Sequence, residues 1–234
     1  MYYPPVEIKV WGRYACFTRP EAKIERVSYE VPTPSAARGI LEAVYWHPPM
    51  QWRVREIVVL NPVRHFSILR NEVIPAMSPD RDGIDIIESR AQRHTLGLRD
   101  VAYIIRADVW LPTNSHDLQA KHRDQFRRRV EQGRCYHRPY LGCREFAADF
   151  SKPDGTEKAQ EKLSVDLGLM LFDVFFRSDK KSRQPNQKEA EFYTHTPEER
   201  LSRKGYAEAV FKRFRLEQGI LRVPGEYYEQ GESA

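Results

Sequence analysis

Three residues in two separated segments carry side chains that could transfer or stabilise protons: Tyr45, Lys121 and His122. Histidine suits proton transfer because its reference pKa of about 6.5 lies close to neutral pH. Lysine supplies positive charge, and tyrosine, with a reference pKa of about 10, can orient a hydroxyl or share its proton. Metal-free RNA cleavage needs these types: a base near the 2′-hydroxyl, an acid near the departing 5′-oxygen and positive charge beside the phosphate. We therefore expect a site for RNA strand scission.

Each of these residues also has a purely structural interpretation. His122 falls on the stripe of a predicted helix that Phe126 and Val130 continue, so it can pack at the edge of the core. Lys121 can be an ordinary solvated cation, and Tyr45 at the end of an apolar helix can belong to the core. The residue types leave both interpretations open. They also do not decide which of Tyr45 and His122 would be the base and which the acid.

Positive charge is concentrated between residues 118 and 145. This segment holds eight Lys and Arg against three acids, a net charge of +5, which equals the formal net charge of the whole chain. Such a density is typical of binding to a phosphate backbone. The consecutive arginines 127–129 fan around a helix, so they cannot all face one ligand. The candidates for a phosphate-binding track are Arg123, Arg127, Arg134, Arg138 and Arg144.

The composition is that of a globular protein, with 41% hydrophobic and 30% charged residues. No stretch approaches the roughly 18–20 apolar residues of a membrane helix. The N-terminus lacks a secretory signal pattern, and three cysteines are too few for a disulfide framework, so we expect a cytoplasmic protein. Glycine-rich phosphate loops, GxSxG and HExxH are missing. Cys135, His137 and Cys143 lack the paired spacing of structural zinc, so we expect no metal and no cofactor.

The order of predicted elements indicates an α+β fold of the ferredoxin-like (RRM-like) βαββαβ type. Thr33 as N-cap and Pro34 at the first helical position begin one helix, which ends before Pro48. A second helix starts at Asn114 or Ser115 and ends at Gly133. The predicted strands cover residues 6–17, 52–63, 101–110 and 140–150, with a β-hairpin over 66–95 inserted after the second of them and a hairpin tip at 78–83.

A polar break over residues 151–157 predicts a domain boundary. We expect a ferredoxin-like domain over residues 1–155 and a small antiparallel β domain over residues 156–234. Strands are predicted at 167–176, 191–196 and 219–223, whereas the basic and aromatic stretch 206–216 fits helix or strand equally well.

Five motifs in order along the chain resemble a known family. They are VWGRYACFT at 10–18, SYEVPT at 28–33, GILEAVYW at 39–46, the pair Lys121-His122 and YLGCREF at 140–146. Together they resemble the pre-crRNA-processing endoribonucleases of type I-C CRISPR systems, members of the RAMP superfamily. Within the last motif, Gly142 suggests a close approach of the backbone to RNA.

The resemblance implies a ferredoxin-like domain with a small C-terminal β domain. It implies metal-free cleavage at the 3′ base of the repeat hairpin, leaving a 5′-hydroxyl and a 2′,3′-cyclic phosphate, with Tyr45, Lys121 and His122 matching the family's catalytic residues. The expected partners are the CRISPR repeat RNA, whose 5′ handle stays bound, and the other subunits of the type I-C interference complex. Two alternatives remain: a non-catalytic subunit that only binds the handle, and a sequence-neutral binder of RNA or duplex DNA.

Overall fold

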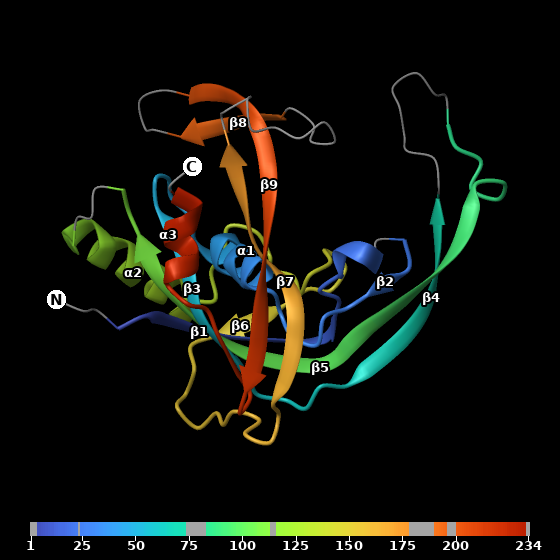
Figure 1. Ribbon diagram of the computed structural model, residues 1–234, viewed down its shortest axis with the longest axis horizontal. Helices are drawn as coiled ribbons and strands as arrows, with labels where there is room; N and C mark the ends of the chain where they lie inside the picture. Colours follow the sequence, from blue (N-terminus) through green and yellow to red (C-terminus); the bar gives the residue numbers. More distant parts are fainter. Residues whose placement is uncertain are drawn as a thin grey trace.

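Four strands and two helices form the predicted ferredoxin-like core (Figure 1). The strands lie in the order β6, β1, β5, β3, with every neighbouring pair antiparallel. Numbered along the chain this is 4-1-3-2, the order of a βαββαβ fold, so the expected fold class is confirmed. The elements are β1 (Val6–Ala15), α1 (Pro34–Val44), β3 (Gln51–Val59), β5 (Arg90–Trp110), α2 (His116–Glu131) and β6 (Asp149–Ser151). The computed structural model describes residues 4–22, 24–73, 83–112, 116–177, 190–195 and 200–232.

Helix α1 begins and ends as its sequence predicts. The Ala36 amide donates to the Thr33 hydroxyl at 3.1 Å, so Thr33 is the N-cap and Pro34 occupies the first turn. Buried side chains recur on one face of the helix, among them Ile40 and Leu41. The helix stops because Tyr45 takes an extended backbone conformation, which turns its side chain out of the helical row.

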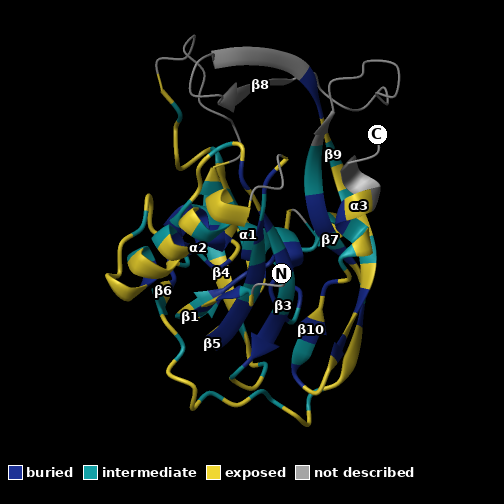
Figure 2. Cartoon of the chain, turned by 90° about the vertical axis from the view of Figure 1, so that its left-hand side faces the viewer, coloured by how far each residue is buried: buried dark blue, intermediate teal, exposed yellow. Residues whose placement is uncertain are grey.

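Helix α2 packs His122, Phe126 and Val130 inward and leaves its outer face exposed (Figure 2). Its C-terminus closes at Gly133, which has a φ of +63°, and the Arg134 amide donates to the Arg129 carbonyl at 2.8 Å. This is the glycine-terminated helix end that the sequence predicts. The two candidate N-cap residues, 114 and 115, lie outside the described residues.

The inserted hairpin and the third predicted strand differ from the expectation in one respect. Strand β4 (His65–Val73) pairs with β5 as a hairpin arm, which is confirmed. However, the second hairpin strand runs without a break into the central strand, giving 21 residues in β5. The chain absorbs the polar residues near position 100 because Asp100 adopts a φ of +54° within the strand. The predicted hairpin tip falls mostly on residues 74–82, outside the described part of the chain.

The fourth predicted strand was placed too early. Residues 140–148 form a loop with one isolated bridge, Tyr140 to Ala147, and the only part of the predicted strand that pairs with β1 is β6. The apolar side chain that suggested a strand, Leu141, is fully buried and anchors the loop, and its carbonyl accepts from the Cys16 amide at 3.0 Å. The backbone of Gly142 lies close to the backbone of Cys16 in the same chain, because a Cβ on Gly142 would be 2.0 Å from the Cys16 carbonyl oxygen.

The C-terminal strands continue the same sheet. β10 (Ile220–Arg222) pairs with β3 on one side and with β9 (Arg200–Glu217) on the other, and β9 then pairs with β7 (Val165–Arg177). The ambiguous stretch 206–216 is strand, within β9. The division of the chain at residues 155/156 stays a prediction. The remaining elements are the short helix η1 (Pro20–Ala22), β2 (Arg26–Val27), β7 (Val165–Arg177), β8 (Ala190–His195), β9 (Arg200–Glu217), β10 (Ile220–Arg222) and helix α3 (Glu226–Glu232).

A buried ion-pair network joins α1 to β7. Arg38 contacts Asp173 at 2.7 Å and Glu42 at 2.9 Å, and Asp173 is 7% exposed. Arg38→Met would leave the Asp173 carboxylate buried without its partner, so we expect a loss of about 2–3 kcal/mol in the free energy of unfolding. Urea denaturation measures it. Arg127→Met is the control, since it breaks only the exposed pair with Asp124 and should change stability by less than about 0.5 kcal/mol. Equal effects of both substitutions would contradict a structural role for the network.

Candidate active site

Tyr45 and His122, 77 residues apart in sequence, are brought together by the packing of α1 against α2. The Tyr45 hydroxyl lies 2.8 Å from Nδ1 of His122, a hydrogen-bond distance. His122 is 8% exposed and Tyr45 is half-buried. Lys121 is exposed on the same helix. The His122 ring therefore lies beside the core, as its structural interpretation predicts. The same ring also contacts Tyr45, the other candidate proton-transfer residue.

The backbone around Tyr45 is fixed by side chains of β3 and α2. The Trp52 indole donates to the Tyr45 carbonyl at 2.8 Å, and its ring packs 4.8 Å from that of Phe126. Arg129 donates to the Val44 carbonyl at 3.0 Å, and its guanidinium lies 5.3 Å from the centre of the Tyr45 ring. These contacts hold the tyrosine at the end of α1 in one orientation, which is the condition for a preorganised site.

The surroundings shift the pKa values of the pair in opposite directions. Burial lowers the pKa of His122, and the positive charges of His47 and Lys121 lower it further, so the neutral imidazole is favoured. Burial raises the pKa of Tyr45, opposed by the Arg129 guanidinium, so the phenol stays protonated. A neutral imidazole beside a protonated phenol can accept a proton from a substrate hydroxyl.

His47 is a further residue of this site, and the sequence analysis did not select it. Its ring lies 5.6 Å from the ring of His122, centre to centre, and the residue is exposed. It follows Tyr45 by two positions in the loop after α1. The only sequence signal was the presence of a histidine so close to a candidate catalytic tyrosine, since a loop carries no periodicity that shows where its side chains point.

The predicted phosphate-binding arginines divide into two groups. Arg123 is 7% exposed, which leaves little of it available to a phosphate. The other four are exposed on α2 and the following loop, and Arg138 pairs with Asp149 at 2.6 Å. Their contact with RNA stays a prediction. The exposed group consists of Arg127, Arg134, Arg138 and Arg144.

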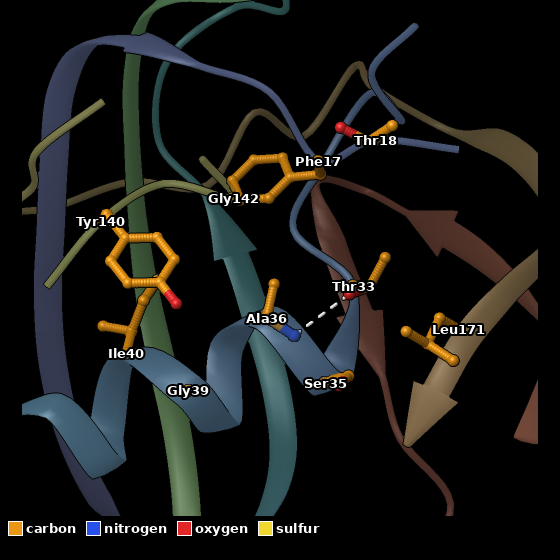
Figure 3. Close-up of a pocket in the computed structure, with 10 residues that line it drawn as sticks. All are labelled: Phe17, Thr18, Thr33, Ser35, Ala36, Gly39, Ile40, Tyr140, Gly142 and Leu171. Carbon is orange, nitrogen blue, oxygen red and sulfur yellow. Dashed lines mark hydrogen bonds between the residues drawn. The ribbon is translucent and has the colours of Figure 1, made fainter. Parts of the chain in front are cut away.

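The loop after α2 runs along α1. The amides of Tyr136 and His137 both donate to the Ala43 carbonyl, at 2.9 and 3.2 Å. Farther along, at the other end of α1, the loop closes one side of a pocket of about 290 Å³ (Figure 3). Its lining residues are Phe17, Thr18, Thr33, Ser35, Ala36, Gly39, Ile40, Tyr140, Gly142 and Leu171.

Within the described residues, no three His, Cys, Asp or Glu side chains are placed to hold a metal ion. Cys143, one of three residues considered for zinc, contacts the Arg26 guanidinium at 3.0 Å. A hydrogen bond with the Cys16 thiol and the Arg26 charge lower the pKa of Cys143 to about 6. In the part of the chain that the structure describes, no helix combines the length and the apolar character needed to cross a membrane.

Comparison with known proteins places the chain among CRISPR-associated proteins. It is 45% identical to the CRISPR pre-crRNA endoribonuclease Cas5d of Thermus thermophilus over 225 residues, which cover 96% of this chain and 93% of that protein. It is 39% identical to the protein of the same name from Mannheimia succiniciproducens over 191 residues, covering 73% of this chain and 85% of that one.

The fold agrees with this relationship. The crystal structure of a CRISPR-associated protein superposes with a TM-score of 0.60 at 20% identity, covering 97% of this chain and 96% of that one. The family described as CRISPR-associated protein Cas5 matches residues 6–224, nearly the whole sequence. The chain therefore belongs to the Cas5 family of CRISPR-associated proteins, in its Cas5d branch.

Proposed function

We propose that this protein is a metal-independent endoribonuclease that cleaves CRISPR precursor transcripts in the cytoplasm. Cleavage occurs at the 3′ base of the repeat hairpin, and the protein stays on the crRNA 5′ handle as a subunit of the type I-C interference complex. The hydrogen-bonded Tyr45–His122 pair beside Lys121 carries this proposal. The 45% identity to a pre-crRNA endoribonuclease over almost the full length supports it.

The geometry suggests the division of roles in the reaction. Nδ1 of His122 lies 2.8 Å from the Tyr45 hydroxyl. In the tautomer whose Nδ1–H donates to that hydroxyl, Nε2 of the neutral ring is the base that takes the 2′-hydroxyl proton, and we assign the reaction to this tautomer. The 2′-oxygen attacks the adjacent phosphorus, and the P–O5′ bond breaks as the 2′,3′-cyclic phosphate forms. Lys121 stabilises the negative charge that develops on the phosphate oxygens. The leaving 5′-oxygen takes up a proton and departs as a hydroxyl.

A second proton-transfer group is needed on the other side of the phosphorus. In an in-line displacement the attacking and leaving oxygens are on opposite sides, and Tyr45 and His122 are bonded to each other, so together they serve the attacking side. The exposed imidazole of His47 lies 5.6 Å from that of His122 and is the acid for the leaving oxygen. The exposed arginines of α2 and its following loop then bind flanking phosphates.

The experiment that tests the function incubates the purified protein with a labelled repeat-hairpin RNA in EDTA. A second RNA carries a 2′-deoxy sugar at the scissile position. Cleavage of the first RNA alone, with a cyclic phosphate end, is the expected result, because the missing hydroxyl is the nucleophile. Tight binding without cleavage would instead identify a subunit that only holds the crRNA handle.

The pH dependence of cleavage should show the titration of His122, the proposed base. Because the pKa of His122 is lowered, the acidic limb of kcat/KM, where the rate rises as this imidazole loses its proton, should lie below the usual histidine pKa of about 6.5. Lys121→Met removes a positive charge that lowers this pKa, so the acidic limb should move to higher pH while the rate falls about 100-fold. Lys121→Arg keeps the charge and should keep the limb in place. An acidic limb that is identical in the methionine variant would mean that His122 is not the titrating base.

A further inference from the structure

Gly39 occupies a position in α1 that the fold does not require to be glycine. It lies in the middle of the helix, where glycine costs about 1 kcal/mol relative to alanine. A Cβ built on Gly39 would meet nothing within 4 Å, in contrast to Gly12 or Gly97, where a Cβ would lie 2.6 or 2.5 Å from another side chain. None of the described residues therefore fills the space above Gly39, and Gly39 lines the pocket at the start of α1.

The lining of this pocket combines flat apolar surface with hydroxyl groups. Figure 3 shows Gly39 and Ile40 of α1 on one side, Phe17 and Gly142 on the opposite side, and Tyr140 closing one end. The Thr33 hydroxyl is used by the helix cap. The hydroxyls of Ser35 and Tyr140 have no hydrogen-bond partner among the described residues and remain available to a ligand.

The size and chemistry of the pocket select a class of ligand. Its volume of about 290 Å³ lies at the lower end of the range of ligand pockets, roughly 300–1,000 Å³. Among the residues that the structure describes, no charged side chain lines it, which argues against a phosphate or a carboxylate as the group inside. A nucleobase is flat and apolar on its faces and carries hydrogen-bonding groups on its edges, which matches aromatic walls with hydroxyls.

One loop contacts both the surroundings of the candidate active site and the pocket. Tyr45 follows the last turn of α1, and the pocket lies along the first half of the helix; Gly39 precedes Tyr45 by six residues, about 9 Å along the helix axis. Between them runs the 134–144 loop, which is bonded to the Ala43 carbonyl. The His137 ring stacks on that of Tyr140 at 6.5 Å with 22° between the planes. Arginines alternate with aromatic residues along this loop, as in grooves that bind single-stranded nucleic acid.

We propose that the pocket at the start of α1 binds one unpaired nucleobase of the substrate RNA, a few nucleotides from the cleaved bond. The identity of the ligand as RNA rests on the proposed function. The base enters the space that Gly39 leaves open, packs against Tyr140, and is recognised through its edge by the free hydroxyls. The phosphates that connect it to the scissile position follow the loop and its arginines.

The test compares Gly39→Leu with Gly39→Ala and with the control Gly83→Leu. Gly83 is also an exposed glycine whose Cβ would meet nothing within 4 Å, but it lies on the hairpin arm. Leucine and alanine are good helix formers, so the Gly39 variants should melt at or above the parental temperature, and thermal unfolding checks this. Binding is measured by fluorescence anisotropy on repeat RNA with a 2′-deoxy scissile sugar, intact or with one abasic nucleotide at each unpaired position in turn.

We expect one abasic position to weaken binding to the parent about tenfold, a typical effect of losing one stacked base. Gly39→Leu should weaken binding of intact RNA by a similar factor and lose nothing more on that abasic RNA, because both changes remove the same contact. The affinity of Gly39→Ala for intact RNA should lie between those of the parent and of Gly39→Leu, and Gly83→Leu should bind with the parental affinity. Parental affinity of Gly39→Leu for intact RNA, or losses that simply multiply, would overturn the proposal. Cleavage of unmodified RNA by the parent protein is measured separately. If the parent does not cleave RNA but Gly39→Leu and the abasic RNA still lose affinity non-additively, the proposed nuclease activity is wrong and the proposed base pocket stands.

Discussion

His122→Ala is expected to abolish cleavage of the repeat RNA while leaving its affinity nearly unchanged. Nε2 of His122 is the proposed base, and positioned general bases contribute roughly 10²–10⁴-fold to rates. Alanine also removes the partner of the Tyr45 hydroxyl. RNA affinity depends on many phosphate contacts, so one imidazole that is only 8% exposed contributes little to it. Single-turnover cleavage and anisotropy on the 2′-deoxy RNA measure the two quantities separately.

The control for this substitution is His94→Ala. His94 is an exposed histidine on β5 in the hairpin arm, so the His94→Ala variant should cleave at the parental rate. Tyr45→Phe is the companion variant. It keeps the ring and removes only the hydroxyl that orients His122, so an intermediate loss is expected. If His122→Ala cleaved as fast as the parent, the ring would have only a packing role at the edge of the core.

The helices of this fold could be predicted because their signals are local. Thr33 and Pro34 define the start of α1 through a cap and a fixed φ, and Gly133 defines the end of α2 through a positive φ. Each of these depends on a few neighbouring residues. The alternation of β1 likewise needed only its own ten residues, of which Val6, Ile8 and Val10 are buried.

The errors occurred where distant contacts override local pattern. The 140–148 segment has the composition of a strand, but Leu141 is buried as a loop anchor and Gly142 lies against the backbone of Cys16, 126 positions away in sequence. Similarly, β5 continues past Asp100 because β1 pairs with it on both sides of that residue, while β4 pairs with its first part. Neither pairing can be read from a window around the residue itself.

The candidate site was predictable in its residue types and not in its geometry. Tyr45, Lys121 and His122 could be chosen for their chemistry and their resemblance to a family. The hydrogen bond between Tyr45 and His122 depends on how α1 packs on α2, and this packing cannot be predicted from the residues of either segment alone. His47 was missed for the same reason, and the open space at Gly39 became visible only when the surrounding loop was in place.

His47→Gln is expected to slow cleavage of ordinary RNA by about 100-fold, because the leaving 5′-oxygen would depart without a positioned acid. Glutamine approximates the size and polarity of histidine but cannot donate a proton as an acid. The ring of His122 on α2 faces His47. His122 in turn contacts the Tyr45 hydroxyl and feels the charge of Lys121, and the Arg129 guanidinium lies over the Tyr45 ring. Histidine as a residue type exchanges protons near neutral pH more readily than lysine, arginine or the half-buried Tyr45, whose pKa is raised by burial, so we assign the acid to His47.

A substrate with a better leaving group separates this role from a structural one. In RNA whose 5′-bridging oxygen is replaced by sulfur, the thiolate leaves without protonation, so His47→Gln should cleave it as fast as the parent does. His122→Ala should remain slow on the same RNA, because the 2′-hydroxyl still has to lose its proton. The exposed residue His65 on β4 provides the control His65→Gln, which should match the parent on both RNAs. If His47→Gln is equally impaired on both substrates, His47 positions the RNA or the His122 ring, and the acid must be another group. Rescue by sulfur, seen for His47 and not for His122, would assign the two imidazoles to opposite sides of the phosphorus.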